Sequence, residues 1–266
     1  PLFAYDRTLY SGRTVSTDGG DTWRDLQMGP SGRAPYVIGV GPLTATLPVV
    51  YAVDEPYTGV TGGRGLVLSE DGGLTWRATE GVAQGIVDVV ASPGFPDDRT
   101  ALLVTAGGFV YGSQDGLTFR YVSRVPSYDP IERNVYDLAL SPDFPMDGIA
   151  LAVVEDPLAS PRANIYFSNN AGRTWQPRTG GLDGSCRPRS ITLSPAFGID
   201  RVVFLGTERR DSDPPLPGLF GSDTGGADWF PESYLGTSVV RDFAWLGVAG
   251  SGKLFAAAGV AGLLAR

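Results

Sequence analysis

The chain has 266 residues, enough for one large domain with a substantial core, and its net charge of −8 argues against nucleic acid as the main partner. It contains no histidine and one cysteine, which excludes Ser-His-Asp and Cys-His catalysis, histidine-ligated zinc and an internal disulfide. The 37 glycines and 21 prolines favour many short strands and turns over long helices. No apolar run approaches the ~20 residues of a membrane-spanning helix. We expect the single cysteine, Cys186, to be a small buried or half-buried filler and not a nucleophile, because no histidine is present to activate it.

In chain order, a pattern of seven or eight residues recurs five times. The copies are STDGGDTW (16–23), SEDGGLTW (69–76), SQDGLTF (113–119), SNNAGRTW (168–175) and SDTGGADW (222–229). They start 53, 44, 55 and 54 residues apart. A period of about 50 residues indicates one supersecondary unit repeated in space.

The chemistry of this segment, called the box turn below, is that of a hairpin between two strands. The aspartate accepts hydrogen bonds from backbone N–H groups, glycine adopts positive φ at little cost, and the final aromatic side chain provides an apolar anchor. We therefore predict a structural role, and not a catalytic or metal-binding one, for these positions: Ser16, Asp18, Gly20, Trp23, Ser69, Asp71, Gly73, Trp76, Ser113, Asp115, Phe119, Ser168, Asn170, Gly172, Trp175, Ser222, Gly226 and Trp229.

The pattern S-x-D-x-G-x-T-W resembles the Asp-box, or BNR repeat, of sialidase-like, sortilin-like and photosystem-assembly-factor-like β-propellers. The copies at 16–23 and 69–76 match it in full. The resemblance implies a β-propeller. It leaves the activity open, because enzymes and binding proteins share this repeat.

A second repeat lies between the box turns. An alternating apolar segment runs into Ser-Pro-x-Phe-x-x-Asp or a close variant at 88–99, 137–148 and 190–201. Proline cannot donate to a sheet, so Ser-Pro predicts the end of a strand, followed by a loop with the phenylalanine tucked beneath it. We predict that this loop joins the first and second strands of each unit, on the same side as the box turns.

Each complete repeat then provides four strands, in the third at 86–92, 100–106, 109–113 and 118–123. Radially arranged four-stranded units form a β-propeller, so the predicted fold is an all-β, antiparallel propeller over residues 1–266 as a single domain. The predicted second strands are 2–5, 49–53, 101–105, 149–154, 202–206 and 253–258. This count favours six blades, with the first unit lacking its innermost strand, and five or seven blades remain compatible with the repeat.

The irregular loops on the opposite side are the predicted binding surface, because function concentrates on variable loops of a regular scaffold. These loops are 54–64, 125–134, 155–164, 178–189 and 207–218. Arginine holds carboxylates, phosphates and sulfates with two parallel hydrogen bonds. The candidate contacts are Arg133, Arg187, Arg189, Glu208, Arg209 and Arg210; the plainer interpretation is that they are loop charges paired with their neighbours.

Two functions from different classes follow. The favoured one is a non-enzymatic binding or assembly scaffold for a protein complex or a glycan, docked in one version at a membrane surface but not spanning it. The alternative is a sialidase-like glycoside hydrolase, for which Glu208 beside two arginines is the nearest candidate, although the Arg-Ile-Pro segment typical of that family is missing. We predict no cofactor and no metal. The chain starts at Pro1, so we expect a mature or trimmed product that acts outside the cytoplasm (secreted, periplasmic or at the cell surface).

Overall fold

The structure is a computed structural model that describes residues 2–5, 8–42, 47–54, 65–82, 85–126, 134–155, 163–182, 186–208, 218–232, 240–246, 253–258 and 262–265. Within these residues it consists of short strands and three helices of four residues each, which confirms the all-β prediction. None of these helices is long enough to cross a membrane. The chain divides into two compact units, residues 1–105 with 109–122 (unit 1) and residues 106–108 with 123–266 (unit 2). The prediction of one domain over 1–266 stays a prediction.

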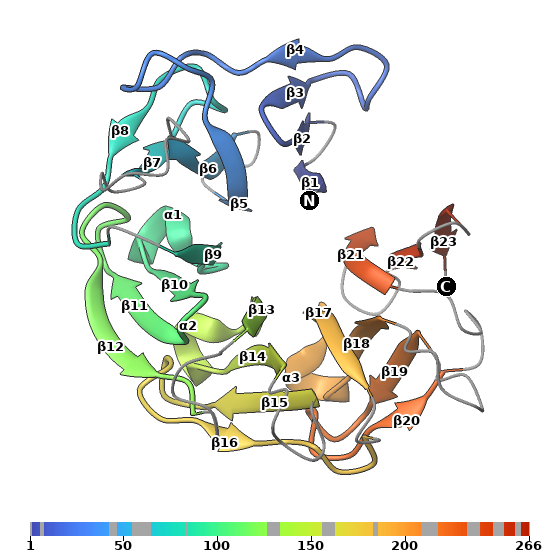
Figure 1. Ribbon diagram of the computed structural model, residues 1–266. Helices are drawn as coiled ribbons and strands as arrows, with labels where there is room; N and C mark the ends of the chain where they lie inside the picture. Colours follow the sequence, from blue (N-terminus) through green and yellow to red (C-terminus); the bar gives the residue numbers. More distant parts are fainter. Residues whose placement is uncertain are drawn as a thin grey trace. The chain divides into compact units, whose positions relative to one another are not determined.

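Unit 1 contains three antiparallel sheets of four strands, which can be followed by their labels in Figure 1. They are β1 (Leu2–Tyr5), β2 (Thr8–Ser11), β3 (Thr14–Ser16) and β4 (Arg24–Asp25); β5 (Tyr36–Pro42), β6 (Pro48–Asp54), β7 (Gly65–Ser69) and β8 (Arg77–Ala78); and β9 (Ile86–Ala91), β10 (Ala101–Thr105), β11 (Phe109–Ser113) and β12 (Arg120–Arg124).

Unit 2 contains two further four-stranded sheets and one of three strands. They are β13 (Asn134–Leu140), β14 (Ala150–Glu155), β15 (Ala163–Ser168) and β16 (Gln176–Pro177); β17 (Arg187–Leu193), β18 (Val203–Glu208), β19 (Leu219–Ser222) and β20 (Phe230–Pro231); and β21 (Val240–Leu246), β22 (Lys253–Ala258) and β23 (Gly262–Ala265). Strands follow one another in sequence order within every sheet.

The predicted strands of the third repeat agree with β9 to β12 within two residues at each end. The prediction for the first sheet is wrong. Leu2–Tyr5 is the first strand of a complete four-stranded sheet, not the second strand of one that lacks its innermost strand. The difference arises at Gly12, whose φ of 59° allows a tight turn that folds residues 8–16 into the hairpin β2–β3.

Each Ser-Pro-x-Phe segment forms one turn of helix instead of an irregular loop. The helices are α1 (Phe95–Asp98), α2 (Phe144–Asp147) and α3 (Phe197–Asp200). Before α1, the Ser92 hydroxyl donates to Asp98 at 2.7 Å and accepts from the backbone N–H of Gly94 at 3.0 Å. Phe95 is buried below this turn, as predicted.

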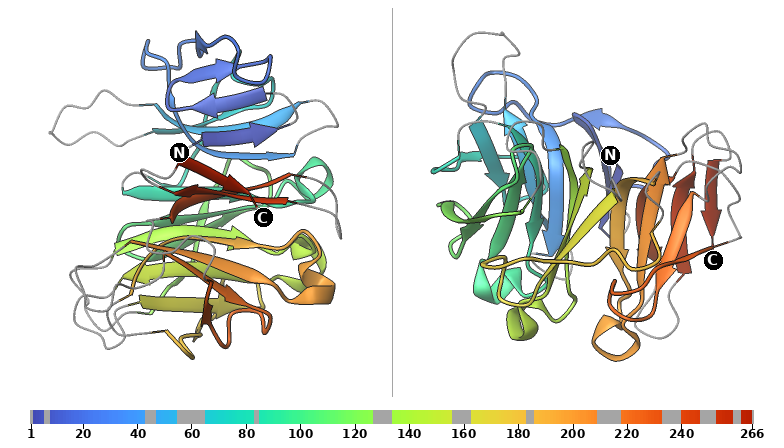
Figure 2. Two further views of the ribbon diagram at one scale, coloured as in Figure 1. Left: turned by 90° about the vertical axis from the view of Figure 1, so that its right-hand side faces the viewer. Right: turned by 60° about the horizontal axis from the view of Figure 1, so that its bottom comes forward.

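The helices and the box turns lie on one side of their sheets, as predicted. In unit 2 the backbone N–H of Gly225, in a box turn, donates to the carbonyl of Arg201 after α3 at 2.9 Å. Ala171 makes the equivalent bond to Gly148 after α2, also at 2.9 Å. Figure 2 shows α2 and α3 at the same end of the unit 2 sheets.

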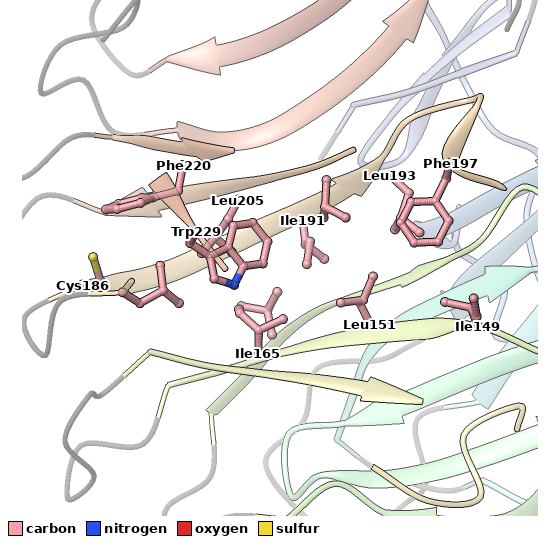
Figure 3. Close-up of a cluster of buried hydrophobic side chains, with 13 residues drawn as sticks. Ile149, Leu151, Ile165, Cys186, Ile191, Leu193, Phe197, Leu205, Phe220 and Trp229 are labelled. Atoms are coloured by element: carbon pink, nitrogen blue, oxygen red, sulfur yellow. The ribbon is translucent and has the colours of Figure 1, made fainter. Parts of the chain in front are cut away.

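Each unit has its own hydrophobic core between neighbouring sheets. In unit 1, Tyr51 packs edge-on against Phe95 and Phe119, and its hydroxyl donates to the carbonyl of Gly116 at 2.9 Å. In unit 2, side chains of β14 and β15 face those of β17 and β18 around Trp229 (Figure 3). Cys186 is fully buried in this second cluster, as expected for a small filler.

The innermost strand of five sheets carries a β-bulge at a corresponding place. The register of β5, β9, β13, β17 and β21 against the next strand shifts by one residue. The extra residues are Ile38, Val87, Tyr136, Arg189 and Arg241. A bulge bends the strand and redirects a side chain, so these positions interrupt the regular alternation of the sheet.

Candidate functional site

The box turns are closed structures whose polar groups are already used. In the copy at 69–76, the Ser69 hydroxyl donates to Asp71 at 2.8 Å and accepts from the backbone N–H of Gly73 at 2.7 Å. The same carboxylate accepts from the backbone N–H of Leu74 at 3.0 Å and of Thr75 at 2.8 Å. Burial alone raises the pKa of Asp71, but these hydrogen bonds outweigh it and leave the pKa below its ordinary value.

The same turn also forms without a carboxylate. In the fourth copy the side-chain oxygen of Asn170 accepts from the Ser168 hydroxyl at 3.0 Å and from the backbone N–H of Thr174 at 2.9 Å. In the fifth copy the hydroxyl of Thr224 accepts from the backbone N–H of Asp228 at 2.9 Å. The turn therefore requires an acceptor at this position and not a charge, which favours the structural interpretation.

Three of the predicted site residues do meet at the opposite strand ends of unit 2. Arg189 donates to Glu208 from Nε at 2.8 Å and from Nη2, and to Glu155 from Nη1 at 3.0 Å. Arg187 approaches Glu155 with its Nε at 3.4 Å from Oε1. One guanidinium thus joins the ends of β14 and β18, and Glu155 lies between two arginines.

An aromatic ring completes this group, called the strand-end cluster below (Tyr136, Glu155, Arg187, Arg189 and Glu208). The guanidinium carbon of Arg189 lies 4.1 Å from the centre of the Tyr136 ring, within cation–π range. The Tyr136 hydroxyl donates to Glu155 at 3.0 Å. Tyr136 and Arg189 are the extra residues of the bulges in β13 and β17, so the bulges bring them into contact.

The cluster is half-buried, and its charged side chains differ in how far they are exposed to solvent. The side chain of Glu155 is 8% exposed, that of Arg189 17% and that of Arg187 33%. Burial lowers the pKa of Arg189, but the hydrogen bonds that it donates to Glu208 and Glu155 outweigh it and raise the pKa overall. Burial raises the pKa of Tyr136, with Arg189 opposing and Glu155 adding to the shift. Arg189 is thereby fixed as a cation inside the cluster.

The other predicted contacts, Arg133, Arg209 and Arg210, lie outside the described residues. So does most of each predicted binding loop except 178–189, of which only residues 183–185 lie outside. The sequence predicts Glu155 only as the first residue of the loop 155–164 and does not indicate Tyr136. A signal for Glu155 was present, because the apolar strands β14 and β18 each end in a glutamate. Among the described residues no group of three or more histidine, cysteine or acidic side chains is placed to hold a metal ion, and the absence of a metal stays a prediction.

No family model and no curated protein matches this chain. Solved structures do. An ancestral GH74 enzyme aligns with a TM-score of 0.66 and 18% identity over 96% of this chain, and the GH74 xyloglucanase from Xanthomonas campestris with 0.60 and 22% over 95%. YCF48 bound to a D1 peptide aligns with a TM-score of 0.60 and 15% identity over 97% of this chain.

These alignments cover 38% and 32% of the two GH74 enzymes and 71% of YCF48. The chain therefore spans well under half the length of these GH74 enzymes. The neighbours are β-propeller proteins, and at these identities the likeness shows the fold alone. The chain has the β-propeller fold, and its neighbours include both glycoside hydrolases and a protein with a bound peptide.

Proposed function

We propose that this chain is a non-enzymatic, six-bladed β-propeller of the Asp-box type that acts as a binding or assembly scaffold. Five four-stranded sheets and a sixth of three strands support the blade number. Five box turns that end in an aromatic residue, with their polar groups bonded internally, support the Asp-box assignment. A regular scaffold with chemistry concentrated at one set of strand ends is the usual arrangement for a recognition surface.

The recognition surface in this proposal is the strand-end cluster with the adjoining loops. Arg187 is the residue that we expect to contact the partner. Its Nε is buried and forms no hydrogen bond within the described residues, and a third of its side chain is exposed. Glu155, its partner at 3.4 Å, is shared with the better placed Arg189. Arg187 therefore retains donors for an acidic group of a partner, whereas Arg189 and Glu208 hold the surface in shape.

The proposed partner is a protein segment that presents a carboxylate. The peptide bound to YCF48 supports a protein partner, because that protein shares the fold. A glycan with an acidic group is the second choice, since the same guanidinium chemistry would hold it. Arg133, Arg209 and Arg210 belong to the proposal as further contacts from the adjoining loops, and an extracytoplasmic location, with or without docking at a membrane surface, is part of it.

A random peptide library selected against the full chain tests this proposal. We expect the selected peptides to share an acidic residue and to bind Arg187→Ala roughly 5- to 150-fold more weakly, the cost of one hydrogen bond to a charged group. Arg173→Ala is the matched control, because Arg173 is an exposed arginine of a unit 2 box turn. Peptides that bind Arg187→Ala as tightly as the wild type would contradict the proposed surface.

The alternative function, a sialidase-like glycoside hydrolase, has one observation in its favour. Glu155 and Glu208 both approach Arg189, so two carboxylates lie near each other at a strand-end surface. Against it, a general acid must carry a proton, whereas both carboxylates accept hydrogen bonds from one guanidinium. Hydrolysis of sialosides or xyloglucan by the purified chain, abolished in both Glu155→Gln and Glu208→Gln, would establish the alternative and reject the scaffold.

A further inference from the structure

The final aromatic residue of the box turns is covered in every sheet of the repeat except the first. Phe119, Trp175 and Trp229 are buried, and Trp229 is only 4% exposed. Trp76 is half-buried. Trp23, at the same position in the first box turn, is 43% exposed. The prediction that each box aromatic anchors its blade is therefore wrong for Trp23, because no comparable segment among the described residues lies over it.

In unit 2 the cover is the chain that leaves the outer strand of the preceding sheet. After β16, the carbonyl of Arg178 accepts from the indole N–H of Trp229 at 3.1 Å, and the carbonyl of Gly180 accepts from its backbone N–H at 2.8 Å. Gly180 and Asp228 form a parallel bridge, and Leu182 enters the core beside Trp229. This segment, residues 176–182, and the equivalent segments that begin at the outer strands of other sheets are called strand tails below.

Unit 1 repeats the arrangement. After β8, the backbone N–H of Glu80 donates to the carbonyl of Leu117, and the carbonyl of Glu80 accepts from the N–H of Phe119, both at 2.9 Å. Val82 then packs into the core, as Leu182 does in unit 2. Between the first two sheets, the indole N–H of Trp76 donates to the carbonyl of Gln27 at 3.1 Å.

A glycine follows the bridging residue in both complete tails. Gly81 has a φ of 95° and Gly181 a φ of 78°. A β-carbon on Gly81 would collide with the carbonyl oxygen of Phe119, and one on Gly181 with that of Trp229. The covering segment is therefore defined chemically: it is extended, carries glycine after the bridging residue, and continues with a branched apolar residue.

Trp23 has the same groups in place, and no segment of the part of the chain that the structure describes covers them. Its indole N–H turns back to the carbonyl of Gly20 in its own box turn at 3.1 Å. Within the described residues, neither the Trp23 backbone N–H nor the Asp21 carbonyl is bonded to a strand tail. The box turn itself is intact, with the backbone N–H of Thr22 bonded to Asp18 at 3.0 Å.

We propose that residues 21–23 form a docking site for an extended segment of another polypeptide, with the sequence character Thr-x-Gly-Val/Leu. The segment would pair in parallel with this box turn, donate to the Asp21 carbonyl, accept from the Trp23 N–H and place a carbonyl over the Trp23 indole. This is strand addition in the form that the protein itself uses between its sheets. The site belongs to the box-turn side of unit 1 and is independent of the strand-end cluster.

The test uses a peptide copied from the strand tail at residues 176–182, acetyl-QPRTGGL-amide, added to the full chain. We expect saturable one-to-one binding by calorimetry and reduced acrylamide quenching of one tryptophan, identified as the signal missing from Trp23→Phe. A peptide with alanine in place of the second glycine should bind at least about tenfold more weakly, because its β-carbon meets the Trp23 carbonyl. Trp23→Ala should weaken binding similarly, whereas Trp76→Phe should not.

Several outcomes would overturn the proposal. They are absence of binding, equal binding of the alanine peptide, and unchanged binding to Trp23→Ala. Protection of Trp23 from acrylamide in the chain alone, without peptide, also overturns the proposal. Protection at all protein concentrations means that another part of the same chain covers the site. Protection only at high protein concentration means that a second copy covers it. Because Trp23 is 43% exposed and lies outside the buried core, its variants should remain folded, and circular dichroism verifies this.

Discussion

In both units, some second strands of the sheets end in an acidic residue, but the two units use these acids differently. In unit 1, β6 ends at Asp54, which accepts from the backbone N–H of Ser31 at 2.7 Å and so fastens a loop of its own unit. In unit 2, β14 and β18 end at Glu155 and Glu208, which hold one arginine between two sheets.

The bulges differ in the same way. The extra residues in unit 1 are the apolar Ile38 and Val87, whereas those in unit 2 include Tyr136 and Arg189, which stack on each other. The same β-bulge thus carries apolar side chains in unit 1 and two members of the strand-end cluster in unit 2. The repeated backbone provides positions, and the strand-end cluster that we propose as a recognition surface occupies those positions in unit 2.

The largest loss of stability should come from emptying a buried aromatic site in the core of a unit. Trp229→Ala should lower the free energy of unfolding by about 3–5 kcal/mol, because it empties a buried aromatic site. Trp23→Ala, at the corresponding place, should cost below about 1 kcal/mol, since Trp23 is 43% exposed. Urea denaturation of both variants measures this, and equal losses would remove the distinction between covered and uncovered box turns.

The next test replaces the charged bulge residue of β17 in unit 2 by the apolar residue found in the bulge of β5 in unit 1. Arg189→Ile should cost about 2–3 kcal/mol, less than for a fully buried ion pair, because it leaves Glu155 and Glu208 without their shared partner while part of the cluster is exposed. Adding Glu155→Gln and Glu208→Gln should recover much of this loss. If Arg189→Ile were as stable as the wild type, the cluster would contribute nothing to the fold and would be free to serve binding alone.

The box turns provide a smaller effect. Asp71→Ala should cost about 1–3 kcal/mol through its lost hydrogen bonds. Asp71→Asn should cost about 1 kcal/mol or less, because Asn170 forms the same turn in the fourth copy. Thermal unfolding of the two variants measures the difference. A loss as large for asparagine as for alanine would show that the charge itself is required.

The smallest effect at any one turn should come from protonation. Side-chain and backbone hydrogen bonds from Thr22 chiefly lower the pKa of Asp18, and backbone bonds from Thr118 and Leu117 that of Asp115. The folded chain then binds fewer protons here than the unfolded chain. This stability is complete above about pH 5, begins to fall as the pH drops below about 4, the ordinary pKa of aspartate, and is lost completely only below the lowered pKa of the folded state. Melting temperatures between pH 7 and 2 follow it. An unchanged melting temperature at pH 3 would contradict the assignment.

The sequence by itself determined the local turns of this protein. In the box turn each hydrogen bond of the serine and the aspartate joins residues at most four apart, and in the Ser-Pro turn Ser92 and Asp98 are six apart. Such bonds depend on residue order, so a repeated pattern predicts a repeated turn and, through its period, a propeller. The helical form of the Ser-Pro turn, the extra hairpin at Gly12 and the exposure of Trp23 departed from these predictions.

Only the tertiary structure decided which charges meet and which box turn is left uncovered. Arg189 is 34 residues from Glu155 and 19 from Glu208, so its partners depend on the register of strands and on bulges. The exposure of Trp23 likewise depends on what packs over it among the described residues and not on its own box, which matches the pattern in full. Local bonds are encoded in adjacent residues, whereas a site assembled from several strands exists only once those strands are packed together.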